Sequence, residues 1–250
     1  PPYYTKFSVA EYQKLAEEKI EEIIARKKIP IICGGTGFYI DSITKGIIFP
    51  SVPPNKKLRE FLEKKSITQL FEKLKKINPE RAKNIDSKNK VRLIRAIEIA
   101  ETLGKIFPSA QDRILSKTLL SNIEDTRENI RENIKFIKVG LFLPPEKLKI
   151  NINQRTSAKT VGMIREATTL HKNGLSWKKM QEFGLEYRFL ALYLQKKITR
   201  PEMIEKINSE TYKYAKRQMT WFKKDPEIQW FDASAKNLEK KVLDIFTNCL

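Results

Sequence analysis

A glycine turn after a short apolar run is the first feature of the sequence that could contact a ligand. Gly34-Gly35-Thr36-Gly37 follows residues 29–33 and precedes a helical pattern. Glycines at a helix start leave backbone N–H groups free and allow close approach, and Thr36 adds a hydroxyl. The turn is neither a Walker A loop nor a dinucleotide-binding fingerprint. It predicts a ligand-contacting turn, and a purely structural turn is the alternative.

Three arginines could bind anions. Arg155 lies in a long helical pattern, and Arg92 and Arg95 are three residues apart on one face of another. A guanidinium binds phosphate oxygens through two parallel hydrogen bonds, so these residues are candidates for phosphate contacts. A solvated basic helix face predicts the same residues, and both interpretations stay open at this point.

The helical pattern over 200–224 combines basic and aromatic side chains. Lys213, Arg217 and Lys224 recur on one stripe. Basic residues bind a phosphate backbone and aromatic rings stack on unpaired bases, which together favour binding of single-stranded RNA. An amphipathic helix with a basic wet face is the alternative. The interleaved aromatics are Tyr212, Tyr214 and Trp221, and the stripe expected to be buried contains Ile204, Ile207, Thr211, Ala215, Gln218 and Phe222.

The composition favours a polyanionic partner and excludes several classes of protein. Lys and Arg number 49 against 30 Asp and Glu, a formal net charge of +19. No apolar run approaches the roughly 18–20 residues of a membrane span. Two cysteines and one histidine, His171, are too few for a zinc cluster or disulfide framework and disfavour a histidine-based triad. We expect a cytoplasmic protein without membrane contact, in which His171 is structural.

Helical periodicity and apolar runs predict an α/β fold. Ser8 with Glu11 three residues later forms a capping-box motif and predicts a helix start. The run 29–33 is predicted as a buried parallel strand, because helix, apolar strand, glycine turn and helix are typical of an α/β core. Further strands are predicted at 136–143 and 229–231. Helices are predicted at 38–43, 58–64, 67–77, 79–84, 90–103, from 144 to about 167, 182–195, 200–223 and 235–247, with a loop and a short helix over 108–134.

The composition changes along the chain and predicts three parts. Prolines at 50, 53 and 54 mark a linker, and residues 56–105 contain 15 basic and 7 acidic residues. We predict a first part of the core over 1–50, a basic helical insertion over 51–125 and a second part of the core over 126–250.

Five segments, in this order, resemble the tRNA isopentenyl transferase family, the tRNA dimethylallyltransferases. The resemblance implies a P-loop-kinase-like parallel-sheet core, incomplete in this chain, with a mainly helical insertion domain that binds the tRNA anticodon stem-loop. It implies transfer of a dimethylallyl group from dimethylallyl diphosphate to N6 of adenosine 37, with Mg²⁺ as cofactor. The sequence itself gives no oligomeric state, and we expect a monomer. The segments are FSVAEYQ (7–13), IPIICGGTGFYI (29–40), KVRLIRAIEIAETLGK (90–105), INQR (152–155) and YAKRQMTWFK (214–223).

The resemblance also implies roles for individual residues. Arg155 would be the catalytic cation that stabilises negative charge on the departing diphosphate, with Gly34 and Gly35 beside the diphosphate. We expect Arg155, the glycine turn and residues 216–221 to face one channel, into which the target adenine is flipped. The implied tRNA contacts are Thr36, Arg59, Arg92, Arg95, Arg188, Lys216, Arg217, Gln218 and Trp221.

Two departures from the family pattern affect these expectations. The sequence lacks the family's Walker-A-type loop and the Asp-Ser pair whose Asp is the general base. We therefore expect these 250 residues to be a fragment that alone transfers little or no prenyl group. A non-catalytic RNA-binding protein derived from the family is the alternative. The second departure is Glu186, which stands where the family usually has glycine before a tyrosine and places a carboxylate near the expected RNA path.

Overall fold

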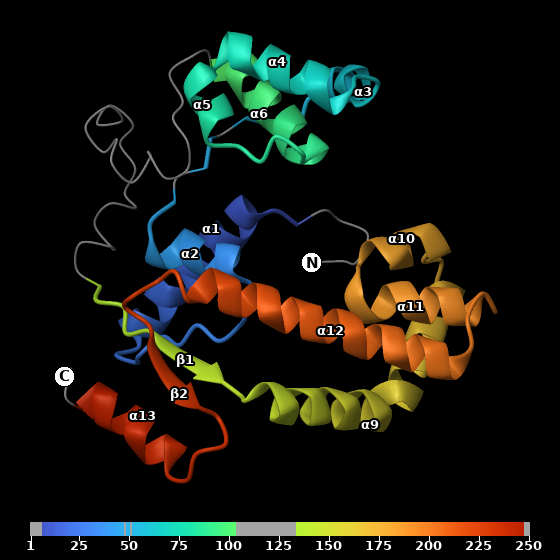
Figure 1. The fold of residues 1–250 in the computed structure, drawn as a ribbon. Helices are drawn as coiled ribbons and strands as arrows, with labels where there is room; N and C mark the ends of the chain where they lie inside the picture. The colour runs from blue at the N-terminus through green and yellow to red at the C-terminus, as the bar shows by residue number, and fades with distance from the viewer. Residues whose placement is uncertain (1–6, 48, 51, 104–133, 248–250) are drawn as a thin grey trace. The chain divides into compact units, whose positions relative to one another are not determined.

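A computed structural model describes residues 7–47, 49–50, 52–103 and 134–247. These residues divide into two compact units (Figure 1). The sheet unit contains residues 34–37 and 135–247, and the helical unit contains the described residues of 7–33 and 38–134. The α/β class is confirmed, since a parallel sheet accompanies the helices. None of the helices in the described ranges combines the length and apolar character of a transmembrane segment.

The sheet unit is built on two parallel strands. β1 (Val139–Phe142) pairs with β2 (Gln229–Asp232) in a register that places Val139 opposite Gln229 and Phe142 opposite Asp232. Parallel neighbours require a crossover, and a run of helices supplies it. The two longest of these, α9 and α12, lie side by side (Figure 1). The helices of this unit are α9 (Pro145–Lys172), α10 (Trp177–Glu182), α11 (Leu185–Leu194), α12 (Arg200–Phe222) and, after the sheet, α13 (Leu238–Thr247).

An apolar cluster fixes the positions of α9–α12. Thr199 and Glu202 form a capping box that begins α12, and Met203 and Ile207 on the next two turns are buried. The basic side chains of α12 are exposed, as the pattern predicts. Of the stripe expected to be buried, only Ile207 is buried and the other residues are half-buried. The buried members of the cluster are Ala167, Leu175, Met180, Leu190, Ala191, Met203 and Ile207.

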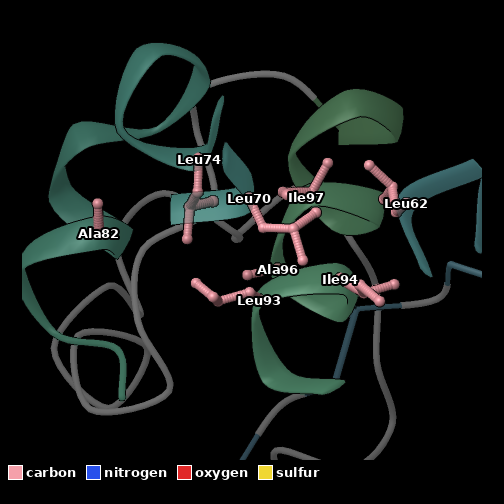
Figure 2. Packing of buried hydrophobic residues seen from close by; sticks show 8 residues of the cluster. All are labelled: Leu62, Leu70, Leu74, Ala82, Leu93, Ile94, Ala96 and Ile97. Atoms are coloured by element: carbon pink, nitrogen blue, oxygen red, sulfur yellow. The ribbon is translucent and has the colours of Figure 1, made fainter. Parts of the chain in front are cut away.

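The helical unit contains its own core. The capping box of Ser8 and Glu11 begins α1 as predicted, and Gln13 on α1 donates hydrogen bonds to the carbonyl oxygens of Ser42 and Ile47 at 2.7 and 3.0 Å. Leucine and isoleucine side chains of α3, α4 and α6 pack together (Figure 2). The helices are α1 (Val9–Ala25), α2 (Gly37–Thr44), α3 (Lys56–Glu63), α4 (Ile67–Ile77), α5 (Pro79–Lys83) and α6 (Lys90–Leu103).

The structure corrects one predicted element and adds one that was not predicted. Residues 29–33 are not a strand: Ile29 and Ile31 are 58% and 80% exposed. A strand requires a hydrogen-bonded neighbour, and within the described residues β1 and β2 pair only with each other. Helix α10 was not predicted, because its six residues are too few to show a helical period. The predicted loop and helix at 108–134 lie outside the described residues except for 134, and the three-part division stays a prediction.

Candidate nucleic-acid and diphosphate site

The glycine turn contacts the C-terminal half of α12. The Gln218 side-chain amide donates a hydrogen bond to the Gly35 carbonyl oxygen at 2.8 Å, and the Thr36 and Tyr214 hydroxyls lie 3.4 Å apart. A Cβ atom on Gly35 would overlap the Gln218 amide, and one on Gly37 would overlap the Trp221 indole ring. The structure therefore brings together Gly35, Thr36, Gln218 and Trp221, four of the predicted site residues.

Cations and aromatic rings alternate beside this contact. The Lys216 ammonium lies 4.9 Å from the centre of the Tyr212 ring, and Lys149 of α9 approaches the same ring to 5.7 Å. The Arg217 guanidinium lies 5.7 Å from the centre of the Tyr214 ring. These distances permit cation–π attraction. Lys216 and Arg217 are nevertheless exposed, so their charges remain accessible to a polyanion.

Part of the positive charge on α12 is offset locally. The Glu210 carboxylate accepts a hydrogen bond from Lys213 at 2.7 Å. This bond, together with the nearby charges of Lys213, Arg217 and Arg188, lowers the pKa of Glu210. Arg188 on α11 is exposed. The structure thus places Arg188 and Arg217 close enough to act on one carboxylate.

Arg155 lies on α9, with its side chain 57% exposed. Its Nη2 donates to the Glu186 Oε1 at 3.2 Å. Asn153, two residues earlier, is hydrogen bonded to Asn208 of α12. Asn208 precedes Gln218 by ten residues, or about 15 Å along a helix. Among the described residues no contact joins Arg155 to the glycine turn, so their convergence on one channel stays a prediction.

Two predicted tRNA contacts of the helical unit converge on Glu98, which is fully buried. Arg59 donates to its two carboxylate oxygens at 2.9 and 2.7 Å, and the backbone N–H of Asn55 donates at 2.6 Å. Arg95 also donates to Glu98 and, at 2.9 Å, to the Val52 carbonyl oxygen. Burial raises the pKa of Glu98, but these hydrogen bonds outweigh burial and lower it to about 2.

The exposure of these arginines differs. The side chains of Arg59 and Arg95 are 37% and 35% exposed, so each is partly covered as well as paired. Arg92 is exposed, and three residues separate it from Arg95 on α6. The sequence therefore located one exposed and two partly covered arginines, but not the carboxylate that orients the two.

The described residues offer no site for a metal formed by protein side chains alone. No group of three or more His, Cys, Asp or Glu residues in the described ranges could hold a metal ion. Mg²⁺ binds through oxygen ligands, usually one or two carboxylates together with substrate phosphates and water. The donor set therefore does not fit an all-protein magnesium site in this part of the chain.

Comparison with known proteins identifies the family. Residues 2–225 match the family model of the IPP transferases. The chain belongs to the IPP transferase family. Within this family it is 36% identical over 245 residues to the tRNA dimethylallyltransferase of Anoxybacillus flavithermus, covering 97% of this chain and 74% of the relative. It is 33% identical over 240 residues to the enzyme of that name from Halothermothrix orenii, covering 94% and 69%.

Solved IPP transferase structures agree with this assignment. The tRNA isopentenylpyrophosphate transferase of Bacillus halodurans superposes with a TM-score of 0.62 at 27% identity, covering all of this chain and 75% of that one. A eukaryotic dimethylallyltransferase that acts on tRNA superposes with a TM-score of 0.72 at 19% identity, covering 98% and 64%, which supports the fold. The α/β fold of the chain is therefore the fold of its family.

Sequence reasoning missed one residue beside the predicted arginines of the helical unit and, in the sheet unit, one contact of a residue it had named. Glu98 was not singled out, although its place three residues after Arg95 on one helix allows such a pair. Tyr214 was recognised only as an aromatic residue among basic ones, and its hydroxyl faces Thr36 across 178 residues of sequence. Spacing alone reveals the first contact, whereas only the folded chain reveals the second.

Proposed function

We propose that this chain acts in the transfer of a dimethylallyl group from dimethylallyl diphosphate to N6 of adenosine 37 in the anticodon loop of tRNA. One observation carries the proposal: in a member of the IPP transferase family, the glycine turn contacts the helix that bears the exposed basic and aromatic side chains. That arrangement suits an unpaired RNA loop, whose phosphates attract cations and whose bases stack on aromatic rings. The named relatives are tRNA dimethylallyltransferases.

The proposed reaction forms one bond and breaks another. The adenine amine attacks the dimethylallyl carbon that carries the diphosphate, and the carbon–oxygen bond breaks with its electron pair on the diphosphate. The amine proton passes to a general base, which the family resemblance implies to be an Asp. Negative charge grows on the departing diphosphate, and a cation already in place lowers the free energy of that transition state. We assign this role to Arg155. The backbone of Gly34 and Gly35 would lie beside the diphosphate.

The tRNA contacts are assigned to two surfaces. On the sheet unit we assign Thr36, Arg188 and the residues of α12. On the helical unit we assign Arg59, Arg92 and Arg95. The target base must leave its stack to react, at a cost of a few kcal/mol that stacking contacts offset. The residues assigned on α12 are Lys216, Arg217, Gln218 and Trp221.

Magnesium remains a prediction that rests on the family resemblance. When bound to the diphosphate, it would neutralise part of the phosphate charge. The described residues contain no group of three or more side chains that could hold it without the diphosphate, and no step of the proposed reaction passes through it. We further propose that the protein acts in the cytoplasm and as a monomer.

A transfer assay tests the proposed function. The 250 residues are incubated with radiolabelled dimethylallyl diphosphate and an anticodon stem-loop containing adenosine 37. A stem-loop with guanosine at that position is the control. A parallel reaction uses the chain joined to the portion of the Anoxybacillus relative outside the match, about a quarter of that protein. Label that enters only the adenosine substrate in the joined protein supports the proposal.

The same reactions, together with a gel-shift measurement of stem-loop binding, address the two remaining expectations. We expect little or no transfer by the 250 residues alone, and measurable turnover by them would contradict that. If the joined protein binds the stem-loop but transfers no label, the alternative of a non-catalytic RNA-binding protein is favoured. If neither protein binds the stem-loop, the tRNA contacts proposed for α12 are wrong.

A further inference from the structure

We propose that Glu186 competes with the diphosphate for Arg155. The Glu186 carboxylate pairs with the Arg155 guanidinium until the diphosphate of the donor substrate displaces it. The inference rests on the proposed role of Arg155. Its structural basis is the 3.2 Å ion pair between Arg155 of α9 and Glu186 of α11.

The carboxylate is fixed in front of Arg155 by the start of α11. Gly184 begins this helix with a φ of 77°, a conformation that favours glycine. Tyr187, adjacent to Glu186, donates a hydrogen bond from its hydroxyl to Glu166 of α9 at 2.7 Å. Glu166 follows Arg155 by eleven residues, about three helical turns, so both lie on the face of α9 that α11 contacts. The Glu186 side chain is only 25% exposed.

The pair is of a kind that a more highly charged anion can displace. Arg155 uses one N–H of its guanidinium for Glu186, while a guanidinium has five N–H donors in all. Its side chain is more than half exposed, and exposed ion pairs contribute little stability. A diphosphate offers more charge and more oxygen acceptors than one carboxylate. Because the diphosphate must break this pair before it can bind Arg155, its apparent affinity is lower than it would be without Glu186, by about two- to five-fold on the scale of such pairs.

Chemical modification of Arg155 measures this competition directly. Phenylglyoxal reacts with accessible guanidinium groups, and peptide mass spectrometry follows the reaction at Arg155 alone in the intact 250-residue chain. Inorganic pyrophosphate serves as the probe that protects this residue. In Glu186→Gln, which preserves size and a hydrogen-bond acceptor, we expect half-protection at a pyrophosphate concentration about two- to five-fold lower than in the unmodified sequence.

A matched variant controls for the loss of a charge. Glu182→Gln removes a carboxylate that pairs with Lys179 at the same distance, 3.2 Å, four residues earlier in the chain. We expect its half-protection concentration to equal that of the unmodified sequence. If Glu186→Gln behaves like this control, the competition is overturned. If Glu186→Gln raises the concentration needed, Glu186 orients Arg155 for the anion, and the competition is again overturned.

A double-variant cycle separates the ion pair from direct repulsion of the diphosphate. Calorimetry with pyrophosphate compares Glu186→Gln in the presence of Arg155 and in an Arg155→Gln background. A gain that disappears without Arg155 supports the proposal, whereas an equal gain in both backgrounds overturns it. The transfer assay is interpreted separately. If the joined protein transfers label but Glu186→Gln needs the same pyrophosphate concentration for half-protection as the unmodified sequence, only this inference is wrong. If the joined protein transfers no label but Glu186→Gln shows the expected gain in pyrophosphate binding, only the proposed function is wrong.

Discussion

At the scale of single residues, the glycines of the turn differ in the space around them: a Cβ atom would meet nothing at Gly34, the Gln218 amide at Gly35 and the Trp221 ring at Gly37. The sequence identified the turn and the helix 200–223 separately, because each has a local pattern. It could not show that Gln218 binds Gly35, since 183 residues separate them. Nor could it show that Glu186 pairs with Arg155, although it marked Glu186 as a carboxylate near the expected site. Contacts between side chains distant in sequence depend on packing, which spacing does not encode.

Alanine substitutions in the turn should follow the space available at each glycine. An added Cβ at Gly34 has no atom within 4 Å, so Gly34→Ala should change the free energy of unfolding by less than about 0.5 kcal/mol. Gly35→Ala displaces the Gln218 amide and should cost about 1 kcal/mol, the contribution of one hydrogen bond. Gly37→Ala meets the larger Trp221 ring and should cost about 1–3 kcal/mol. Urea unfolding monitored by circular dichroism checks this order.

A different order would contradict the described contact between the turn and α12. In particular, equal costs for Gly34→Ala and Gly37→Ala would mean that the Trp221 ring does not lie against Gly37 in solution. Fluorescence of Trp221 in a Trp177→Phe, Trp230→Phe background provides a second readout, because only Gly37→Ala should move this indole directly.

At the scale of elements, the sequence predicted most helices because their starts carry local motifs. Ser8 and Glu11 form the capping box that begins α1, and the strands at β1 and β2 coincide with two predicted apolar runs. Residues 29–33 have the same apolar character but no strand neighbour in the described chain. An apolar run indicates a segment that can pair or be buried, but it does not indicate which segment lies beside it.

Glu98 links several segments of the helical unit, and its ionisation should make their stability depend on pH. The pKa of Glu98 is lowered from 4.5 to about 2, so the carboxylate stabilises the folded state above pH 4.5. This contribution, about 3 kcal/mol, is lost as the pH falls from 4.5 towards 2. Glu98→Gln should therefore reduce the free energy of unfolding at pH 7 by about 2–4 kcal/mol and flatten its decline below pH 4.5. Urea unfolding at a series of pH values measures both effects.

Glu101→Gln is the matched control for this prediction. Glu101 lies one turn later on α6 and pairs with Lys73 at 2.7 Å, but both side chains are about one-third exposed. We expect a change below about 1 kcal/mol at pH 7 and the normal decline in acid. If the two variants behave alike, the hydrogen bonds of Arg59, Arg95 and Asn55 do not stabilise a buried carboxylate in solution.

At the scale of the whole molecule, the charge is too large to be explained by any one site. The net charge is +19, and the cations of α12 that the sequence marked as an exposed stripe are exposed in the structure. Such an excess accelerates association with any polyanion and adds affinity that does not depend on RNA sequence. Composition therefore favours a polyanionic partner, whereas the family match was needed to propose tRNA.

Salt dependence distinguishes a direct phosphate contact from this general attraction. Each phosphate contact to single-stranded RNA contributes about 0.7 to the slope of log K against log salt concentration. Arg217→Ala should therefore weaken binding of the anticodon stem-loop and reduce the slope by about that amount. Fluorescence anisotropy between 50 and 300 mM salt measures the slope, because the Debye length falls by more than half over this range. Lys240→Ala removes an exposed cation from α13 and therefore has the same net charge as Arg217→Ala. We expect it to leave the slope unchanged. Equal slopes in the two variants would mean that Arg217 acts only through the overall charge, and the contact assigned to it would be wrong.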